Sequence, residues 1–170
     1  MRISTLTRKW NISEQIIKSF LKEQDNNFDM SADEISEKQY ESLIMHFGNE
    51  IIIDESKGIV CYSLQVNRVT QYYIVRKKDN LFLDVDGNKM FTSLLVGHMT
   101  VPTMLTLNQY NTHGGYDRGI VSISEDGLLE VVCPFGKEYD FIDGVDHDLA
   151  RVRKTINGVS LGTVPRPKNS

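Results

Sequence analysis

The hydrophobic residues of this chain of 170 residues change their spacing near residue 48. Up to that point they recur at intervals of three and four residues, which is typical of one face of an α-helix. Beyond it they form short runs rich in Ile, Val and Tyr, which are typical of β-strands. The sequence therefore predicts an α+β fold. We expect a small helical, helix-turn-helix-like module at residues 1–48, a body of antiparallel β-hairpins at residues 49–164, and a flexible tail at residues 165–170.

The composition is that of a soluble globular protein, with 40% hydrophobic and 25% charged residues. The net charge of −4 argues against a general attraction to nucleic acid, which needs concentrated Lys and Arg. Cys61 and Cys133 are too few and too far apart for a disulfide framework or a zinc site, and they favour a reducing compartment. No apolar stretch approaches the roughly 20 residues that cross a bilayer, and no export signal is recognised. We therefore expect a cytoplasmic protein that does not enter the membrane.

The first 48 residues contain helix start and stop signals. Arg2-Ile3-Ser4 predicts a short strand, followed by about one helical turn up to Trp10. Ser13 is a candidate N-cap, because its hydroxyl can accept a hydrogen bond from an amide of the next turn, and it predicts a helix to Glu23. A second helix is expected to begin near Ser36 and to end at Gly48. Their apolar faces consist of Ile16, Ile17, Phe20 and Leu21 in the first helix and Tyr40, Leu43, Ile44 and Phe47 in the second.

A longer pattern runs through the same module. It comprises Leu6, Trp10, Asn11-Ile12-Ser13, Ile16, Ile17, Phe20-Leu21-Lys22, Phe28, the run Ser36-Glu37-Lys38-Gln39-Tyr40, and Leu43. This pattern resembles the small N-terminal module of bacterial translation initiation factor two. The resemblance covers residues 1–48 alone, and the chain has no GxxxxGK[ST] phosphate loop, so it is not an initiation factor. The resemblance implies a helix-turn-helix-like fold and contact with RNA, DNA or a ribonucleoprotein.

Charge is distributed unevenly within the module. Five basic residues outnumber two glutamates between residues 1 and 24, whereas six acidic residues outnumber one lysine between residues 25 and 48. The first half could contact phosphate, or its charges could form a solvated face, which is the more common role. The candidate nucleic-acid-binding residues are Arg2, Arg8, Lys9, Lys18 and Lys22.

The body contains short β-prone runs separated by turn signals. The runs are residues 51–53, 58–64, 71–75 and 81–85, and the turns lie at 55–58 and 86–88. We expect these runs to pair as antiparallel hairpins. The stretch 91–107 fits either a strand or an irregular segment, and 108–119, which contains His113-Gly114-Gly115, predicts a flexible loop.

The last third contains a second family pattern. It consists of Gly119–Ile123, Glu125-Asp126-Gly127, Val131–Pro134, Tyr139-Asp140-Phe141-Ile142 and Leu149–Val152, with Asn157–Leu161 opening a further unit. Residues 116–164 thereby resemble a degenerate WG repeat, although Arg118 stands where the family has its tryptophan. An earlier Asp86-Gly87 turn, forty positions before Asp126-Gly127, is a fainter echo. The resemblance implies a β-rich interaction scaffold without a common chemistry.

The polar clusters predict no catalytic, metal or cofactor site. Asp140, Asp143, Asp146 and Asp148 lack the spacing of a calcium loop, and His46, His98, His113 and His147 form no zinc-binding pair. Asp84-Val85-Asp86-Gly87-Asn88 is interpreted as a hairpin turn. The cysteines are expected to be small buried hydrophobes, and Gly114-Gly115 lacks the setting of a phosphate loop. Tyr62, Tyr72, Tyr73, Phe82 and Phe91 could form a stacking surface, but core packing is the preferred interpretation.

The sequence thus favours a non-enzymatic binding or adaptor protein. In this hypothesis the WG-like body contacts one protein partner and the helical module contacts a second. The alternative is a nucleic-acid- or ribonucleoprotein-associated regulator that contacts phosphate through residues 1–24. No cofactor is expected, and the oligomeric state is left open.

Overall fold

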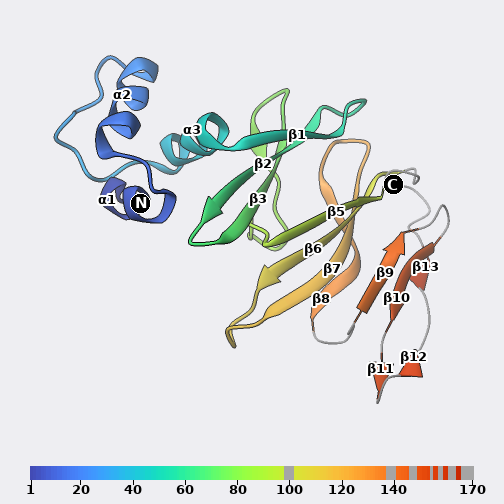
Figure 1. The fold of residues 1–170 in the computed structure, drawn as a ribbon. Coiled ribbons are helices and arrows are strands. Elements are labelled where there is room, and N and C mark those ends of the chain that lie inside the picture. Colours follow the sequence, from blue (N-terminus) through green and yellow to red (C-terminus); the bar gives the residue numbers. More distant parts are fainter. Residues whose placement is uncertain are drawn as a thin grey trace. The chain divides into compact units, whose positions relative to one another are not determined.

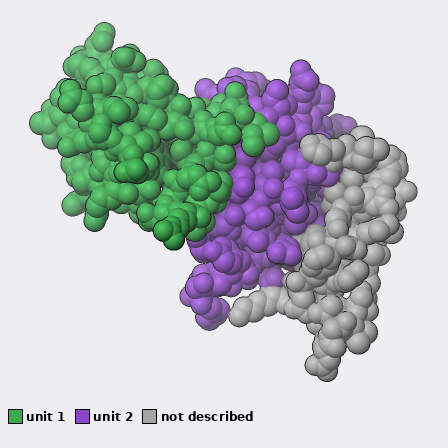
Figure 2. Space-filling view, in the orientation of Figure 1, with its two compact units in different colours: residues 1–51, 62–71 green, residues 52–61, 72–170 purple. Residues whose placement is uncertain are grey.

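The computed structural model describes residues 1–97 and 102–136, and beyond them the backbone of 141–145, 149–153, 155–156, 159–160 and 164–165. The chain forms two compact units, shown in different colours in Figure 2. The helical unit comprises Met1–Ile51 and Tyr62–Gln71, and the sheet unit comprises Ile52–Cys61 and Tyr72–Ser170. Helices at the start of the chain are followed by strands, so the predicted α+β fold is confirmed (Figure 1).

The first helix, α1 (Ile3–Trp10), begins where the sequence predicted a short strand, and that prediction is wrong. Arg2, which precedes the helix, provides no side-chain cap. The cap comes instead from Asp33. Its carboxylate accepts hydrogen bonds from the Ser4 amide at 2.9 Å and the Ser4 hydroxyl at 3.0 Å, and its carbonyl accepts one from the Ile3 amide at 2.8 Å. These bonds satisfy amides that lack a partner within the helix, so the helix begins at Ile3, inside the predicted strand.

Helices α2 (Glu14–Gln24) and α3 (Glu37–Phe47) lie where the sequence predicted them. The Ser13 hydroxyl accepts a hydrogen bond from an amide in the first turn of α2 at 3.3 Å, which confirms the predicted cap. Ser36 caps α3 through a reciprocal pair of bonds with Gln39. The Gln39 amide donates to the Ser36 hydroxyl at 3.1 Å, and the Ser36 amide donates to the Gln39 side-chain oxygen at 2.8 Å. This capping box satisfies two donors at once and fixes the start of α3.

Gly48 follows the last residue of α3 at a tightly packed position. Its φ of −74° is accessible to any residue, so left-handed backbone is not what requires a glycine here. A Cβ at this position would lie 2.5 Å from the Ile44 carbonyl oxygen and 3.1 Å from the Tyr62 Cβ. The backbone therefore approaches its neighbours more closely than a larger residue allows.

The first sheet contains β1 (Asn49–Asp54), β2 (Ile59–Val66), β3 (Val69–Arg76) and β4 (Leu81–Phe82), in that order. The boundary between the two units passes through the first three strands. The predicted strands are present, although β4 is shorter than the predicted run of residues 81–85. Beyond it, residues 83–85 lead directly into the next turn.

Two tight turns position these strands. Asn67 and Arg68, between β2 and β3, have φ values of 50° and 69°, and Asp86 and Gly87 have φ values of 51° and 83°. Positive φ at both central residues matches the right-handed twist of the flanking backbone. The Asp84 carboxylate accepts a hydrogen bond from the Gly87 amide at 2.8 Å, which confirms the interpretation of this acidic run as a turn.

The second sheet is antiparallel, with the order β5 (Ser93–Gly97), β6 (Met104–Tyr110), β7 (Tyr116–Ile123) and β8 (Leu129–Gly136). The predicted flexible loop at 108–119 is wrong, because β6 and β7 continue through most of it. The intervening residues are held by Asn111, whose side-chain oxygen accepts hydrogen bonds from the His113 and Gly115 amides, each at 2.9 Å. The structure also decides the stretch 91–107 in favour of strands where it is described.

The core of the sheet unit is formed by side chains from both sheets. Its buried members are Ile53, Ile59, Cys61, Ile74, Leu83, Val85, Phe91, Leu105, Leu107, Val121 and Ile123. Because alternate residues of a strand point to one face, the core receives Ile59 and Cys61 from β2, Leu105 and Leu107 from β6, and Val121 and Ile123 from β7. This packing holds the exposed strand positions in a fixed arrangement.

The remaining strands are β9 (Phe141–Val145), β10 (Leu149–Arg153), β11 (Thr155–Ile156), β12 (Val159–Ser160) and β13 (Val164–Pro165). They form the antiparallel groups β13-β10-β9 and β11-β12. The Tyr139-Asp140 turn, Asp146, Asp148, His98, His147 and residues 166–170 lie outside the described residues, as does the Asp143 side chain.

Candidate interaction surfaces

Three of the five candidate nucleic-acid-binding residues make intramolecular contacts. The Arg2 guanidinium donates to the Glu34 carboxylate at 3.1 Å, in a pair that is itself exposed. The Lys18 ammonium lies 2.8 Å from the Glu14 carboxylate, and the Lys18 side chain is only 12% exposed. The third, Lys22, donates to the carbonyl oxygens of Asn26 and Phe28. Lys18 thus stabilises α2, and Lys22 binds the segment that follows it.

Arg8 and Lys9 differ from the other three. Both are exposed in the last turn of α1, and the described part of the chain provides no partner for either side chain. Cations near the carboxyl end of a helix also stabilise it by interacting with its dipole. Arg8 and Lys9 are therefore the two of the five candidates that make no intramolecular side-chain contact among the described residues.

The helical unit has an aromatic surface where α2 meets α3. Phe20 stacks on His46 with ring centroids 4.0 Å apart, and it packs edge to face with Phe47 with centroids 6.1 Å apart. Ile16 lies one turn before Phe20 on α2 and is 54% exposed. We define Ile16, Phe20, His46 and Phe47 as the α2–α3 aromatic surface. A protein partner could bury it, because aromatic rings supply large contact areas at interfaces.

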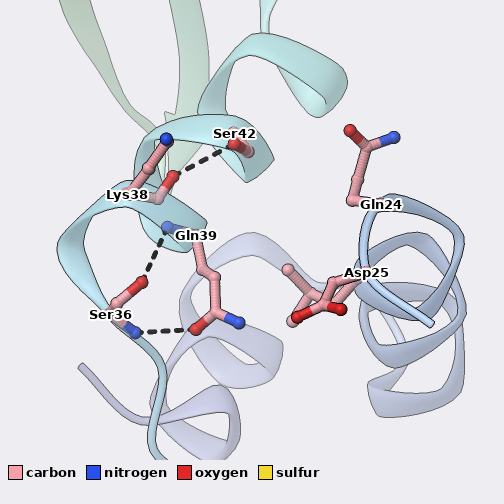
Figure 3. Close-up of a pocket in the computed structure, with 7 residues that line it drawn as sticks. Gln24, Asp25, Ser36, Lys38, Gln39 and Ser42 are labelled. Atoms are coloured by element: carbon pink, nitrogen blue, oxygen red, sulfur yellow. Dashed lines mark hydrogen bonds between the residues drawn. The ribbon is translucent and has the colours of Figure 1, made fainter. Parts of the chain in front are cut away.

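A polar groove lies between the end of α2 and the start of α3. Its volume is about 530 Å³, and Figure 3 shows Gln24 and Asp25 on one side and the α3 residues opposite them. The remaining lining residues are Leu21, Ser36, Lys38, Gln39 and Ser42. Much of this polarity is already used, because Ser36 and Gln39 bond each other and the Ser42 hydroxyl donates to the Lys38 carbonyl at 3.0 Å. The groove therefore presents a mixed-charge rim without a nucleophile and base in contact.

The sheet unit carries an exposed tyrosine pair that sequence reasoning missed. Tyr110 and Tyr116 lie opposite each other where β6 ends and β7 begins, with ring centroids 5.0 Å apart. A hydrogen bond between their hydroxyls, together with slight burial, raises the pKa of Tyr110 above its ordinary value. Two residues further along each strand, Arg118 donates to the Asn108 side-chain oxygen at 3.1 Å. The sequence did not reveal this pair, because Gly114-Gly115 made residues 108–119 resemble a flexible loop.

The predicted aromatic set has a different role. Tyr62, Tyr73, Phe82 and Phe91 are buried, and Tyr72 is partly buried. Tyr73 and Phe82 pack edge to face with centroids 5.9 Å apart. The prediction that these rings mainly pack in the interior is confirmed.

Both thiols are buried. Desolvation raises the pKa of Cys61 to about 12 and the pKa of Cys133 to about 11. A thiolate is the reactive form of cysteine, so at neutral pH neither side chain is a ready nucleophile. This confirms the expectation of small buried hydrophobes.

The described residues do not bring together three His, Cys, Asp or Glu side chains in a group that could hold a metal ion. His46 stacks on Phe20, and His113 lies in the turn between β6 and β7. Within the same residues, no helix is long and apolar enough to cross a membrane.

Comparison with known proteins finds no matching protein family, no similar curated protein and no similar solved structure.

Proposed function

We propose that the chain is a non-enzymatic adaptor protein in which the helical unit and the β body each bind a protein partner. The observation that carries the proposal is the α2–α3 aromatic surface. Ile16 is 54% exposed on α2, one turn before Phe20, which stacks on His46 of α3. Exposed apolar groups that cluster are more typical of binding surfaces than isolated ones.

The β body supports the proposal through its own exposed side chains. Tyr110 and Tyr116, which flank the turn between β6 and β7, are each about half exposed. A rigid sheet holds such groups in place without ordering cost when a partner binds. The WG-like pattern, which implies an interaction scaffold, agrees with this role.

The test begins with the full chain as bait in an affinity capture from a bacterial lysate. We expect Ile16→Glu to remove at least one partner, because a carboxylate would be buried against apolar groups. Gln15→Glu is the matched control, since it places the same charge on an exposed position of α2 away from Phe20. The partner should then be purified and titrated directly. If no partner is recovered that Ile16→Glu loses and Gln15→Glu keeps, the role of this surface is refuted.

The alternative function is contact with nucleic acid. Arg8 and Lys9 favour it, because they are adjacent, exposed and without a partner among the described residues. Such contacts release counterions, so affinity should fall steeply as salt rises, whereas an apolar protein interface is less sensitive.

A gel-shift titration of the full chain with RNA and DNA at two salt concentrations tests this alternative. Arg8→Glu with Lys9→Glu should abolish binding. Arg68→Glu with Lys78→Glu makes the same charge change at exposed turns elsewhere and should preserve it. Absence of binding by the wild type at low salt would eliminate this function.

A further inference from the structure

β5 lies at the margin of its sheet. The strand order β5-β6-β7-β8 gives it a neighbour on one side (Figure 1). The chain before β5 is joined to β3 by the bridge between Phe91 and Tyr72, so the open part of the edge begins after Ser93. In the described part of the chain, the backbone of residues 94–96 pairs with β6 alone. Unpaired backbone groups along an edge can receive another strand.

The side chains of this edge are apolar on both faces. Leu94 and Val96 pack against the core of the sheet unit, whereas Leu95 points away from it and is 65% exposed. Across the sheet, Leu95 is in register with Thr106. Thr106 is in register with Ile120, and Ile120 with Cys133. Thr106, Ile120 and Cys133 are buried, whereas Leu95, at the end of the same row of side chains, is exposed.

The other edges of the two four-stranded sheets carry features that discourage strand addition. β1 contains Glu50 and Asp54, which would oppose each other if β1 paired with its own copy about Ile52. β4 has only two residues, and β8 contains Glu130 and Pro134. Charges, proline and short length are the usual protections of an edge strand. Ser93-Leu94-Leu95-Val96-Gly97 has none of them.

We infer that β5 pairs antiparallel with β5 of a second copy, joining two sheets into one. Pairing about Leu95 places Leu95 opposite Leu95 of the second copy and Leu94 opposite Val96. No charge meets another charge or an apolar group in this arrangement. A charged partner strand would leave its ionic groups against leucine and valine, so the neutral edge favours a neutral strand, and β5 of a second copy is one. The inference does not depend on the proposed adaptor function.

Sedimentation velocity and light scattering on the full chain test this pairing. We expect the mass to rise from monomer toward dimer as concentration increases through the micromolar range. Leu95→Lys should weaken the dimer by about tenfold or more, because two ammonium groups would face each other. Val131→Lys, at an exposed position of β8, is the control and should leave the mass unchanged. A wild type that stays monomeric, or equal behaviour of the two variants, would overturn the inference.

A cross-linking measurement tests the register. Directly opposed strand residues have Cβ atoms about 4.5–5.5 Å apart, close to the spacing that a disulfide requires. With oxidised glutathione as oxidant, Leu95→Cys should form a covalent dimer and Val131→Cys should not. The native Cys61 and Cys133 are buried and should not compete. Failure of Leu95→Cys to cross-link, or equal cross-linking of both variants, would overturn the pairing about Leu95.

Discussion

The Asp54 carboxylate accepts a hydrogen bond from the Thr103 hydroxyl at 2.9 Å, although 49 positions separate the two residues. The same carboxylate accepts bonds from the Ser56 hydroxyl at 2.7 Å and the Lys57 amide at 3.2 Å. Partial burial raises the pKa of Asp54, but the bonds from Ser56, Thr103 and Lys57 together lower it below its ordinary value of 3.8. Asp54 therefore ties the end of β1 to the chain that enters β6.

This bond predicts a pH-dependent stability. Because the folded-state pKa of Asp54 is lowered, its contribution is present above the ordinary pKa and is lost as the pH falls through the folded value. Thr103→Val should lower the free energy of unfolding by about 0.5–1.5 kcal/mol at neutral pH. The difference should shrink in acid. Urea denaturation across the acidic range measures it, with Thr103→Ser, which keeps a hydroxyl, as control. A difference independent of pH would contradict the role of the carboxylate.

Packing at position 119 is predicted to require a residue without a Cβ. A Cβ on Gly119 would lie 2.7 Å from the Phe135 ring, which stacks on Phe91 with centroids 6.4 Å apart. Gly119→Ala should destabilise the protein by about 1–3 kcal/mol through overpacking. Adding Phe135→Leu should recover part of the loss in thermal denaturation. If the two substitutions are simply additive, the ring is not the obstacle.

The capping box of α3 should control local opening of that helix. Ser36→Ala removes the acceptor for the Gln39 amide and should cost about 1 kcal/mol, whereas Ser36→Gly should cost only a few tenths. Hydrogen exchange of amides in the first turn of α3 is the appropriate measurement. Amides of α1 report on any general effect. Equal exchange in both variants would argue against the cap.

The tyrosine pair should be visible in a titration. The hydrogen bond with Tyr116 and slight burial raise the pKa of Tyr110, so Tyr116→Phe should move the Tyr110 titration to lower pH. Ring-carbon NMR signals can follow it, with Tyr110→Phe providing the assignment. An unchanged midpoint would show that the two hydroxyls do not interact in solution.

Thiol reactivity should report unfolding. Desolvation raises the pKa of Cys61 to about 12 and the pKa of Cys133 to about 11, so neither should react readily with a disulfide reagent near neutral pH. Both should react once denaturant exposes them. The exposed Val131→Cys variant provides a positive control for the folded protein. Rapid modification of a native thiol without unfolding would contradict its burial.

Local signals explain which features the sequence predicts well. The caps Ser13 and Ser36 act on amides three residues away, so their patterns can be identified without tertiary information. The start of α1 could not be predicted in this way, because its cap, Asp33, lies 29 positions from Ser4.

The candidate surfaces follow the same distinction. The Glu14–Lys18 pair is one helical turn apart and could be anticipated. The Arg2–Glu34 pair and the Phe20–His46 stack join separate segments, so composition gave no sign of them. The tyrosine pair required knowledge of the strand register, which depends on the Asn111 turn.

The boundary between the compact units makes residues 1–48 a poor candidate for excision. Tyr62, Leu64 and Val66 are buried and belong to the helical unit, although they lie in β2, after residue 48 in the chain. A fragment that ends at Gly48 would lack these three side chains. The other fragment, which begins at Asn49, would expose them to water. Grafting the helices onto another protein should therefore include residues up to Gln71. Because the boundary between the units passes through β1, β2 and β3, neither unit can be excised without cutting these strands.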